Sequence, residues 1–328
     1  MIYVKELCKT FRVARRDGGM KNTLKSFFHR EYTEIHALDH LNFTIGEGEM
    51  VGYIGPNGAG KSSTVKVLSG ILVPDSGICT VGGRVPWKER TAHVAQIGVV
   101  FGQRSQLWWD VPVIDTFTLL RDIYSVPETI YRRNLDELTE MLGLSQLLRT
   151  PTRQLSLGQR MRCEIAASLI HDPKILFLDE PTIGLDAVSK IAVRDFIKAR
   201  NRERGTTVIL TTHDMQDIEA LTERILLIGR GRILRDGSLD ALKREYMTER
   251  HMTVLCAGLD ADTLSLPAGM TLSESHPDRA VFSLDTTVLP VSDAIAAVSA
   301  QTDIYDLSVE NPSLDTLITH LYKEYEVG

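Results

Sequence analysis

The most informative stretch of the sequence is Gly55-Pro56-Asn57-Gly58-Ala59-Gly60-Lys61-Ser62, which fits the pattern G-x-x-x-x-G-K-[ST] at every fixed position. In such a loop successive N–H groups point at a phosphate, Lys61 reaches the β- and γ-phosphates, and the Ser62 hydroxyl is a ligand of Mg²⁺. A short apolar run over residues 50–54 precedes the loop and helical spacing over residues 65–68 follows it. This strand–loop–helix context is the one that a phosphate loop requires. The glycine spacing is not G-x-G-x-x-G, so a dinucleotide-binding loop is excluded.

A second motif supplies the carboxylates that a phosphate loop needs. Four apolar residues at 175–178 predict a buried strand, and Asp179 and Glu180 follow directly at its carboxyl end. Ligands of open α/β sheets bind at that end of the strands. We therefore expect Asp179 to hold Mg²⁺ and Glu180 to be the general base for an attacking water. The alternative is that the two acids cap the following helix, and the phosphate loop makes it the weaker interpretation.

Strands and helices alternate around these two motifs, as in an α/β nucleotide-binding unit. The apolar patterns predict further strands over residues 2–7, 38–45, 96–101, 207–211, 224–228 and 232–236. They predict helices over residues 161–170, 188–204 and 215–221, with a mostly helical stretch over 113–148.

The character of the sequence changes after Gly237. Short alternating stretches and three helical patterns predict a small α+β domain. Residues 250–328 hold three basic and twelve acidic residues, a balance of −9, whereas residues 12–30 have a balance of +5. A charge jump of this kind is typical of a domain boundary, although a solvated acidic surface is the alternative. We expect a first domain over residues 1–240 and an acidic α+β domain over 241–328.

Composition excludes several classes of protein. The chain has 328 residues, 43% of them hydrophobic, and a formal net charge of −6. No apolar run approaches the roughly 18 residues of a membrane helix, and charged residues interrupt the first ten positions, which argues against a signal peptide. The four cysteines form no Cys-x-x-Cys pair, which argues against a disulfide framework or a structural zinc site. A secreted, membrane-spanning or zinc-finger protein is not expected.

Segments between and around the two motifs resemble a known family. Leu155-Ser156-Leu157-Gly158-Gln159 is similar to the LSGGQ signature of the ATP-binding-cassette (ABC) ATPases. Gln103 resembles the glutamine of their Q-loop, Asp186 in Gly184-Leu185-Asp186 the aspartate of their D-loop, and His213 their switch histidine. Phe11 stands where the family has an aromatic residue that stacks on adenine. All these elements occur in family order over about residues 1–240.

The resemblance implies a P-loop NTPase fold of the ABC type, with a helical subdomain over about residues 104–172. It implies ATP and Mg²⁺ as cofactors and ATP hydrolysis as the activity, with Glu180, His213 and Gln103 catalytic and Ser62, Gln103 and Asp179 at the metal. The residues that it assigns to ATP are Phe11, Gly55, Pro56, Asn57, Gly58, Ala59, Gly60, Lys61, Ser62 and Ser63.

The resemblance also implies partners. In this family Ser156, Gly158 and Gln159 serve the nucleotide of the opposite subunit, and one chain has one phosphate loop and one signature. Two complete sites then need two chains, head to tail about a twofold axis. Members without membrane spans usually drive a separately encoded permease, which would hold this chain peripherally at the cytoplasmic face of the cell membrane. We expect no nucleic-acid partner, since the tail is acidic.

Two features depart from the family pattern. Leu157 replaces the first glycine of the signature pair, and a positive φ there would be costly for leucine. The second departure is a basic insertion over about residues 12–36, which adds about 20 residues between Phe11 and Leu38. It includes Phe27, Phe28 and Tyr32. We consider three interpretations of this insertion: a longer solvated hairpin, a contact with a partner protein, or a contact with anionic lipid.

A tryptophan pair indicates how a permease could bind. Trp108 and Trp109 are adjacent and cannot share one face of a strand or helix, so we expect at least one to be exposed to a partner, unless both pack in a local core. The cassette with its small C-terminal domain is similar to exporter ATPases of the daunorubicin-resistance and viologen-exporter type, which export drugs or lipid-like compounds. The alternatives are an importer ATPase, a soluble ABC ATPase acting on DNA or ribosomes, and a nucleotide-binding regulator without turnover. Glu180 and His213 disfavour the last.

Overall fold

The computed structural model describes residues 2–14, 32–102, 104–246, 249–256, 264–276 and 278–327. The chain divides into two compact units, Met1–Gly237 with Val327–Gly328, and Ser238–Glu326. Among the helices of the described ranges, none combines the length and the apolarity that a membrane span needs.

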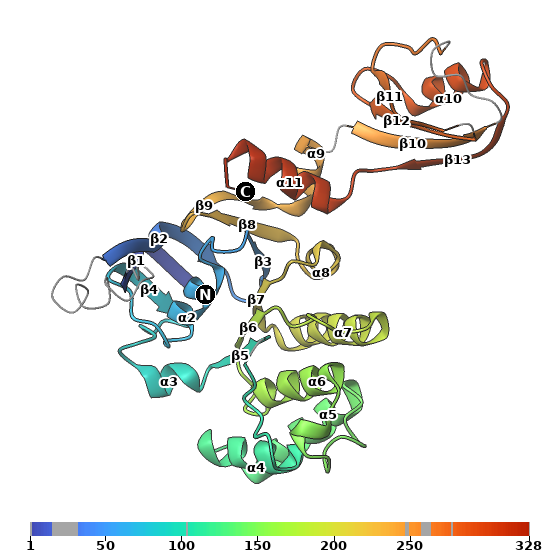
Figure 1. Ribbon diagram of the computed structural model, residues 1–328. Coiled ribbons are helices and arrows are strands. Elements are labelled where there is room, and N and C mark those ends of the chain that lie inside the picture. The colour runs from blue at the N-terminus through green and yellow to red at the C-terminus, as the bar shows by residue number, and fades with distance from the viewer. Residues whose placement is uncertain are drawn as a thin grey trace, which may run out of the picture. The chain divides into compact units, whose positions relative to one another are not determined.

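The first unit is built on a large sheet. Its described strands are β3 (Met50–Ile54), β5 (Ile97–Phe101), β6 (Ile175–Asp179), β7 (Thr207–Thr211), β8 (Arg224–Gly229) and β9 (Arg232–Ser238). They lie in the order β5-β6-β7-β3-β8-β9, and the pairs from β5 to β8 are parallel (Figure 1). β6 and β7 are almost wholly buried, as strands of a parallel sheet covered on both faces are. Crossovers separate the parallel strands, so their carboxyl ends gather at one edge.

A second, antiparallel sheet lies beside this one and contains β1 (Ile2–Ala14), β2 (Tyr32–Ile45) and β4 (Ser76–Val81) in the order β2-β1-β4. β1 and β2 pair from Ile2↔Ile45 to Ala14↔Tyr32. Both strands are longer than the patterns over 2–7 and 38–45 predicted. The outer part of the hairpin is exposed, so cross-strand pairing extends it without burial of its apolar side chains. Residues 15–31, the centre of the predicted basic insertion, lie outside the described residues.

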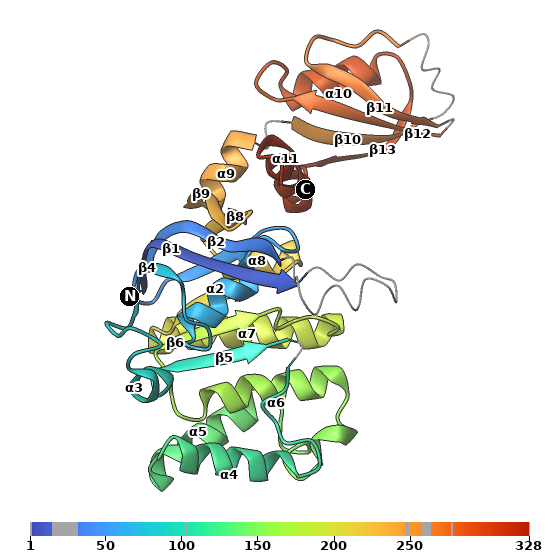
Figure 2. The same ribbon diagram turned by 60° about the vertical axis from the view of Figure 1, so that its left-hand side comes forward.

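The helices of the first unit form two sets. One set lies against the sheets: α2 (Lys61–Leu68), α3 (Arg90–Val94), α7 (Ala187–Arg204) and α8 (Met215–Leu221). The other lies beyond the β5 edge of the large sheet: α4 (Val113–Ile123), α5 (Glu128–Met141), the 3₁₀ turn η1 (Thr152–Gln154) and α6 (Leu157–Leu169) (Figures 1 and 2). α6 contacts both α4 and α5, so the signature helix is part of this group. α2 lies in the other set, beside β2 and β4.

The core that fixes the phosphate loop lies between the two sheets and α2. Tyr53, Val65, Leu68, Phe177 and Leu226 belong to one buried cluster. Burying an apolar side chain of this size stabilises the fold by about 1.5–3 kcal/mol. The strand before the loop and the helix after it are thus both anchored in the same core.

The second unit consists of a sheet and three helices in its described residues: α9 (Leu239–Tyr246), β10 (Glu249–Cys256), β11 (Met270–His276), β12 (Arg279–Asp285), α10 (Val291–Ser299), β13 (Ile304–Glu310) and α11 (Leu314–Glu324). The sheet is antiparallel in the order β11-β12-β10-β13. Met252, Val254 and Phe282 of the sheet pack with Ala294 and Val298 of α10. This is the α+β pattern that the sequence predicted for the C-terminal region.

Candidate functional site

The phosphate loop runs from the end of β3 to the start of α2. A Cβ atom on Gly60 would lie 2.5 Å from the Ala37 carbonyl oxygen, and the φ angle of Gly60 is +112°. Both facts require glycine at this position. At the other end of the loop, a Cβ atom on Gly55 would lie 2.3 Å from the Ile228 carbonyl oxygen. β2 and β8 therefore clamp the loop from two sides and hold its shape before any ligand binds.

Lys61 is the buried cation of the loop. Its side chain is 7% exposed, and its Nζ donates hydrogen bonds to the carbonyl oxygens of Gly55 at 2.5 Å and Pro56 at 3.0 Å. Desolvation lowers the pKa of Lys61, and the charges of Glu180 and Asp179 oppose this shift. A partly desolvated ammonium held within the loop is suited to bind phosphate oxygens.

Asp179 lies at the end of β6, beside the first turn of α2. Its Oδ2 accepts a hydrogen bond from the Ser62 hydroxyl at 3.3 Å, and its Oδ1 accepts one from the Thr211 hydroxyl. Ser62 and Asp179 thus bring a hydroxyl and a carboxylate oxygen together across the loop. Mg²⁺ prefers oxygen ligands and binds proteins through one or two carboxylates together with substrate phosphates. The pair fits Mg²⁺ on this chemistry.

The side chains of Glu180, which follows β6, and His213, which follows β7, lie together. The Nε2 of His213 is 3.2 Å from the Oε1 of Glu180, and the two side chains are 48% and 21% exposed. Glu180 has a φ angle of +55°, a conformation that a non-glycine residue adopts at a cost of about 1–3 kcal/mol. Its N–H donates to the Thr211 carbonyl at 2.8 Å, which holds this backbone in place. The sequence predicted roles for both residues but not their contact.

A buried carboxylate anchors the two segments that carry this pair. Asp217 of α8 is fully buried and accepts hydrogen bonds from Thr182, two residues after Glu180, and from Thr212, the residue before His213. Arg194 of α7 pairs with the same carboxylate at 2.5 Å. Asp217 could not be singled out from the sequence, since an acid in the first turn of a helix gives no signal of its burial.

Two further candidates are less completely defined. Gln103 lies outside the described residues, although the Gly102 N–H next to it donates to the Asp179 carbonyl at 2.7 Å. Phe11 lies on β1 opposite Ile35, is 37% exposed, and has the Lys9 ammonium 5.8 Å from its ring centroid. The roles of Gln103 in catalysis and of Phe11 in adenine stacking remain predictions.

The signature forms the start of α6. The Ser156 hydroxyl accepts from the Gln159 N–H at 3.3 Å, and the Gln159 side chain accepts from the Ser156 N–H at 2.9 Å, a reciprocal capping box. Leu157 is the first helical residue and does not have a positive φ angle. The strain considered for leucine at this position therefore does not arise. Gly158 follows in the first turn of the same helix.

The signature contacts the D-loop of its own chain. A Cβ atom on Gly184 would lie 2.3 Å from a Leu157 methyl carbon, so the leucine side chain covers this glycine. The Asp186 carboxylate caps α7 by accepting from the Ser189 N–H at 2.9 Å, and this hydrogen bond is the main reason that its pKa is lowered. A Cβ atom on Gly158 would lie 3.3 Å from the Ser189 hydroxyl oxygen. The two segments therefore form one packed surface.

Glu164 connects α6 to the segment that follows Gln103. This buried residue accepts hydrogen bonds from the Ser105 hydroxyl and, at 3.1 Å, from the Gln106 N–H. Burial raises the pKa of Glu164, and the hydrogen bonds oppose this shift. Glu164 was not among the predicted site residues, although the sequence contains a signal for it: Glu164 is a lone acid within the apolar pattern of residues 161–170.

We expect Glu164→Ala to free residues 105–107 from α6. A buried N–H that loses its acceptor costs about 1–3 kcal/mol, so amide hydrogen exchange at Gln106 should become roughly 5- to 150-fold faster. Exchange of a peptide covering residues 104–112, measured by mass spectrometry, checks this. Glu140→Ala, at an exposed position of α5, is the matched control. Unchanged exchange in Glu164→Ala would show that the carboxylate does not hold the segment.

Known proteins resemble this chain over most of its length. The family model for ABC transporters matches residues 38–183. Daunorubicin resistance ATP-binding protein DrrA3 of Streptomyces coeruleorubidus is 34% identical over 303 residues, which cover 89% of this chain and 93% of that protein. Doxorubicin resistance ATP-binding protein DrrA of Mycobacterium tuberculosis is 30% identical over 290 residues, with coverage of 86% and 87%.

Solved structures agree with the relatives. A dimeric structure of the ATP-binding cassette MJ0796, in a post-hydrolysis state bound to ADP and Pi, superposes with a TM-score of 0.61 at 27% identity. The superposition covers 73% of this chain and 99% of the MJ0796 chain. These findings confirm the predicted P-loop NTPase fold of the ABC ATPase type.

Proposed function

Because the chain belongs to the ABC transporter family, whose ATP-binding domain hydrolyses ATP, we propose that it is the ATP-binding subunit of an exporter. Two copies, arranged head to tail, would hydrolyse ATP at their interface and drive a separately encoded membrane permease. The subunit would then be peripheral, at the cytoplasmic face of the cell membrane. The resistance proteins named among its relatives support drugs or lipid-like compounds as the cargo.

One observation carries the proposal of a homodimer. The loop of residues 55–62 connects β3 to α2 beside the two sheets. Ser156 instead caps the start of α6, which is grouped with α4 and α5 (Figure 1). The N-termini of α2 and α6 are both suited to phosphate, because a helix N-terminus favours an anion. A second copy related by a twofold axis can supply its Ser156 to the nucleotide on the first copy's loop. The dimeric structure of the MJ0796 cassette supports a dimer here.

The residues of the chain divide the hydrolytic work. The loop N–H groups and Lys61 hold the β- and γ-phosphates, so that the γ-phosphorus faces Glu180. Glu180 accepts a proton from water while the water oxygen bonds to the γ-phosphorus and the bond to the β–γ bridging oxygen breaks, which leaves ADP and phosphate. His213 holds Glu180 in position and can donate to the γ-phosphate. Mg²⁺, held by Ser62, Asp179 and Gln103, would withdraw charge from the phosphate oxygens.

The permease contact is proposed at the tryptophan pair. Trp108 and Trp109 are 58% and 52% exposed. The sequence predicted that at least one of them is exposed, and both are. They follow Ser105 and Gln106, which are hydrogen-bonded to Glu164. The Arg153 backbone N–H donates a hydrogen bond to the Trp109 carbonyl at 3.0 Å. Two adjacent exposed tryptophans on an anchored backbone are suited to a protein interface, where tryptophan is enriched.

We expect Trp108→Ala and Trp109→Ala each to weaken the permease complex by at least tenfold, as loss of a buried interface tryptophan commonly does. ATP binding by the isolated chain should not change, since neither tryptophan belongs to the phosphate loop or to the strands that clamp it. Copurification with a coexpressed membrane permease, from detergent-solubilised membranes, measures this. Tyr305→Ala removes an exposed aromatic side chain of the second unit and is the control. Intact copurification in both tryptophan variants would end this part of the proposal.

A further inference from the structure

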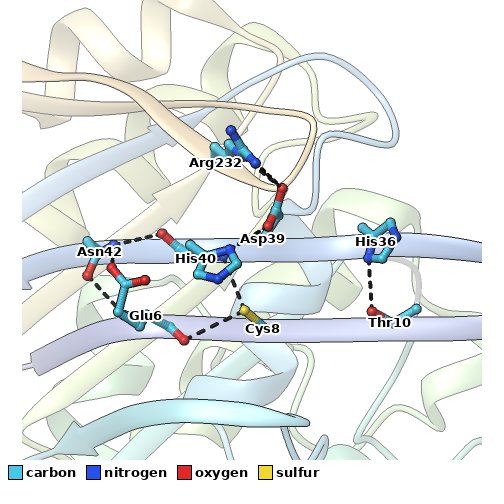
Figure 3. Close-up of polar contacts among 8 residues, drawn as sticks. All are labelled: Glu6, Cys8, Thr10, His36, Asp39, His40, Asn42 and Arg232. Carbon is cyan, nitrogen blue, oxygen red and sulfur yellow. Dashed lines mark hydrogen bonds and ion pairs between the residues drawn. The ribbon is translucent and has the colours of Figure 1, made fainter.

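Three side chains with metal-binding atoms lie together on the β1–β2 hairpin. They are Cys8 of β1 and Asp39 and His40 of β2, and their ligand atoms all lie within 4.8 Å of one another (Figure 3). None of the three belongs to the nucleotide site described above. A thiol, an imidazole and a carboxylate together form the donor set that zinc-type ions prefer.

Hydrogen bonds hold the three side chains of the cluster in place. The Cys8 sulfur accepts a hydrogen bond from the His40 backbone N–H at 3.3 Å, and its thiol donates one to the Glu6 carbonyl at 3.7 Å (Figure 3). Asp39 Oδ1 is 2.7 Å from His40 Nδ1, and Arg232 Nε donates to Asp39 Oδ2 at 2.7 Å. Arg232 also orients this carboxylate from outside the cluster, as the outer partners of metal ligands do.

The backbone around the cluster is held in an unusual shape. The pairing of β1 with β2 shifts register between Val4 and Leu7 and again on either side of Lys9. His40 has a φ angle of +50°, which is uncommon for histidine. Asn42 donates from Nδ2 to the His40 carbonyl at 2.7 Å and thereby fixes this turn of the strand (Figure 3). The irregularity brings the Cys8 sulfur to His40 instead of leaving it on a regular strand face.

The cluster is open to ions from solvent. The His40 side chain is 64% exposed and that of Asp39 is 26% exposed. A hollow of about 450 Å³ at the surface is lined by Asp39, His40, Asn42, Arg232 and Ile233. Cys8 is partly exposed, whereas the other three cysteines of the chain are buried. Of the four thiols, Cys8 is therefore the one that a hydrated ion can reach.

We propose that Cys8, Asp39 and His40 form a binding site for a divalent ion of the zinc type. These residues supply three ligands, and water completes a tetrahedron. The thiolate selects against Mg²⁺ and Ca²⁺, which prefer oxygen, so the site is chemically distinct from the one at Ser62 and Asp179. Binding requires Cys8 to release its proton to solvent and His40 to turn its ring from the hydrogen bond with Asp39 to the ion.

The site would join β1 to β2 where β2 meets the phosphate loop. The Asp39 N–H donates to the Gly231 carbonyl at 2.9 Å, and the Gly231 N–H donates to the Ala59 carbonyl at 2.9 Å. Two hydrogen bonds thus lead from a metal ligand to the loop that holds the nucleotide. An ion at the cluster would therefore hold β2 against β1 next to the phosphate loop.

Cobalt(II) titration of the reduced, chelator-treated full-length chain tests the proposal, because a cobalt–thiolate bond gives a charge-transfer absorption that oxygen and nitrogen ligands do not. We expect one Co²⁺ per chain with this absorption, displaced by Zn²⁺. Cys8→Ser should abolish the absorption, and His40→Asn should weaken binding by more than tenfold. His36→Asn is the matched control, since His36 lies on the same strand and bonds to Thr10 outside the cluster.

A second readout follows the strands themselves. Saturating Co²⁺ should slow amide exchange over residues 2–14 and 32–45 in the wild-type chain and in His36→Asn, but not in Cys8→Ser, with circular dichroism to verify that each variant is folded. A folded wild-type chain that shows no thiolate absorption would overturn the proposal, because it would leave only weak binding by surface histidines. An absorption that persists in Cys8→Ser would overturn it as well.

Discussion

Glu180→Gln is expected to lower the rate of ATP hydrolysis by roughly 10²–10⁴-fold, the usual contribution of a general base, while the chain still binds ATP. An amide cannot accept the proton of the attacking water. The substitution keeps the size of the side chain, and the backbone that carries it is fixed by the Thr211 carbonyl. Lys61 and the glycines of the loop are unchanged, so the phosphates keep their partners.

The assay is phosphate release at saturating ATP, with nucleotide affinity measured separately by a fluorescent analogue. Glu223→Gln makes the same chemical change at an exposed position before β8 and should leave both quantities unchanged. Loss of affinity together with turnover would indicate a role in binding. Hydrolysis at the wild-type rate would remove Glu180 from the mechanism.

The second large effect concerns the two halves of the shared site. Lys61→Ala removes the buried cation that binds the β- and γ-phosphates. Because a charge-assisted hydrogen bond contributes about 1.5–3 kcal/mol, we expect ATP affinity to fall roughly 10- to 150-fold and turnover to be lost with it. The backbone of the loop should keep its shape, since the clamp by β2 and β8 does not involve this side chain.

Ser156→Asp is the complementary change at the signature. Aspartate caps a helix as well as serine does, so α6 should still form. Its charge would repel the γ-phosphate of the opposite subunit, and hydrolysis should fall to background even though the phosphate loop of the variant chain is intact. Ser156→Thr keeps both the cap and the hydroxyl and is the control. Normal turnover by Ser156→Asp would exclude the signature from the nucleotide site.

Much of the first unit could be predicted from local patterns. The apolar run at 175–178 and the phosphate loop each contain their own signals, and β7 and α8 begin and end where their patterns do. A parallel sheet buries whole strands, so its strands appear as continuous apolar runs. The length of the hairpin of β1 and β2 was underestimated, because its outer pairs, such as Arg12 with Glu34, are exposed and join residues far apart in the chain.

The contacts that join segments far apart in the chain could not be predicted. The approach of His213 to Glu180, the clamp of Glu164 on Ser105, and the meeting of Cys8 with His40 all depend on tertiary packing. The spacing of the cysteines argued against zinc in the form of Cys-x-x-Cys pairs. It carries no information on a site with one cysteine, whose other ligands come from a neighbouring strand.

The central claim is that each nucleotide is held by the phosphate loop of one chain and the signature of another. It is tested most directly by mixing Lys61→Ala with Ser156→Asp, two variants that are each expected to be inactive. A mixed head-to-tail dimer contains one site with both defects and one with neither, so random pairing should restore about a quarter of the wild-type ATPase activity. Recovery near that level when the two are combined in equal amounts would establish the shared site. A mixture that stays at background, although sedimentation shows that the two chains associate in ATP, would contradict it.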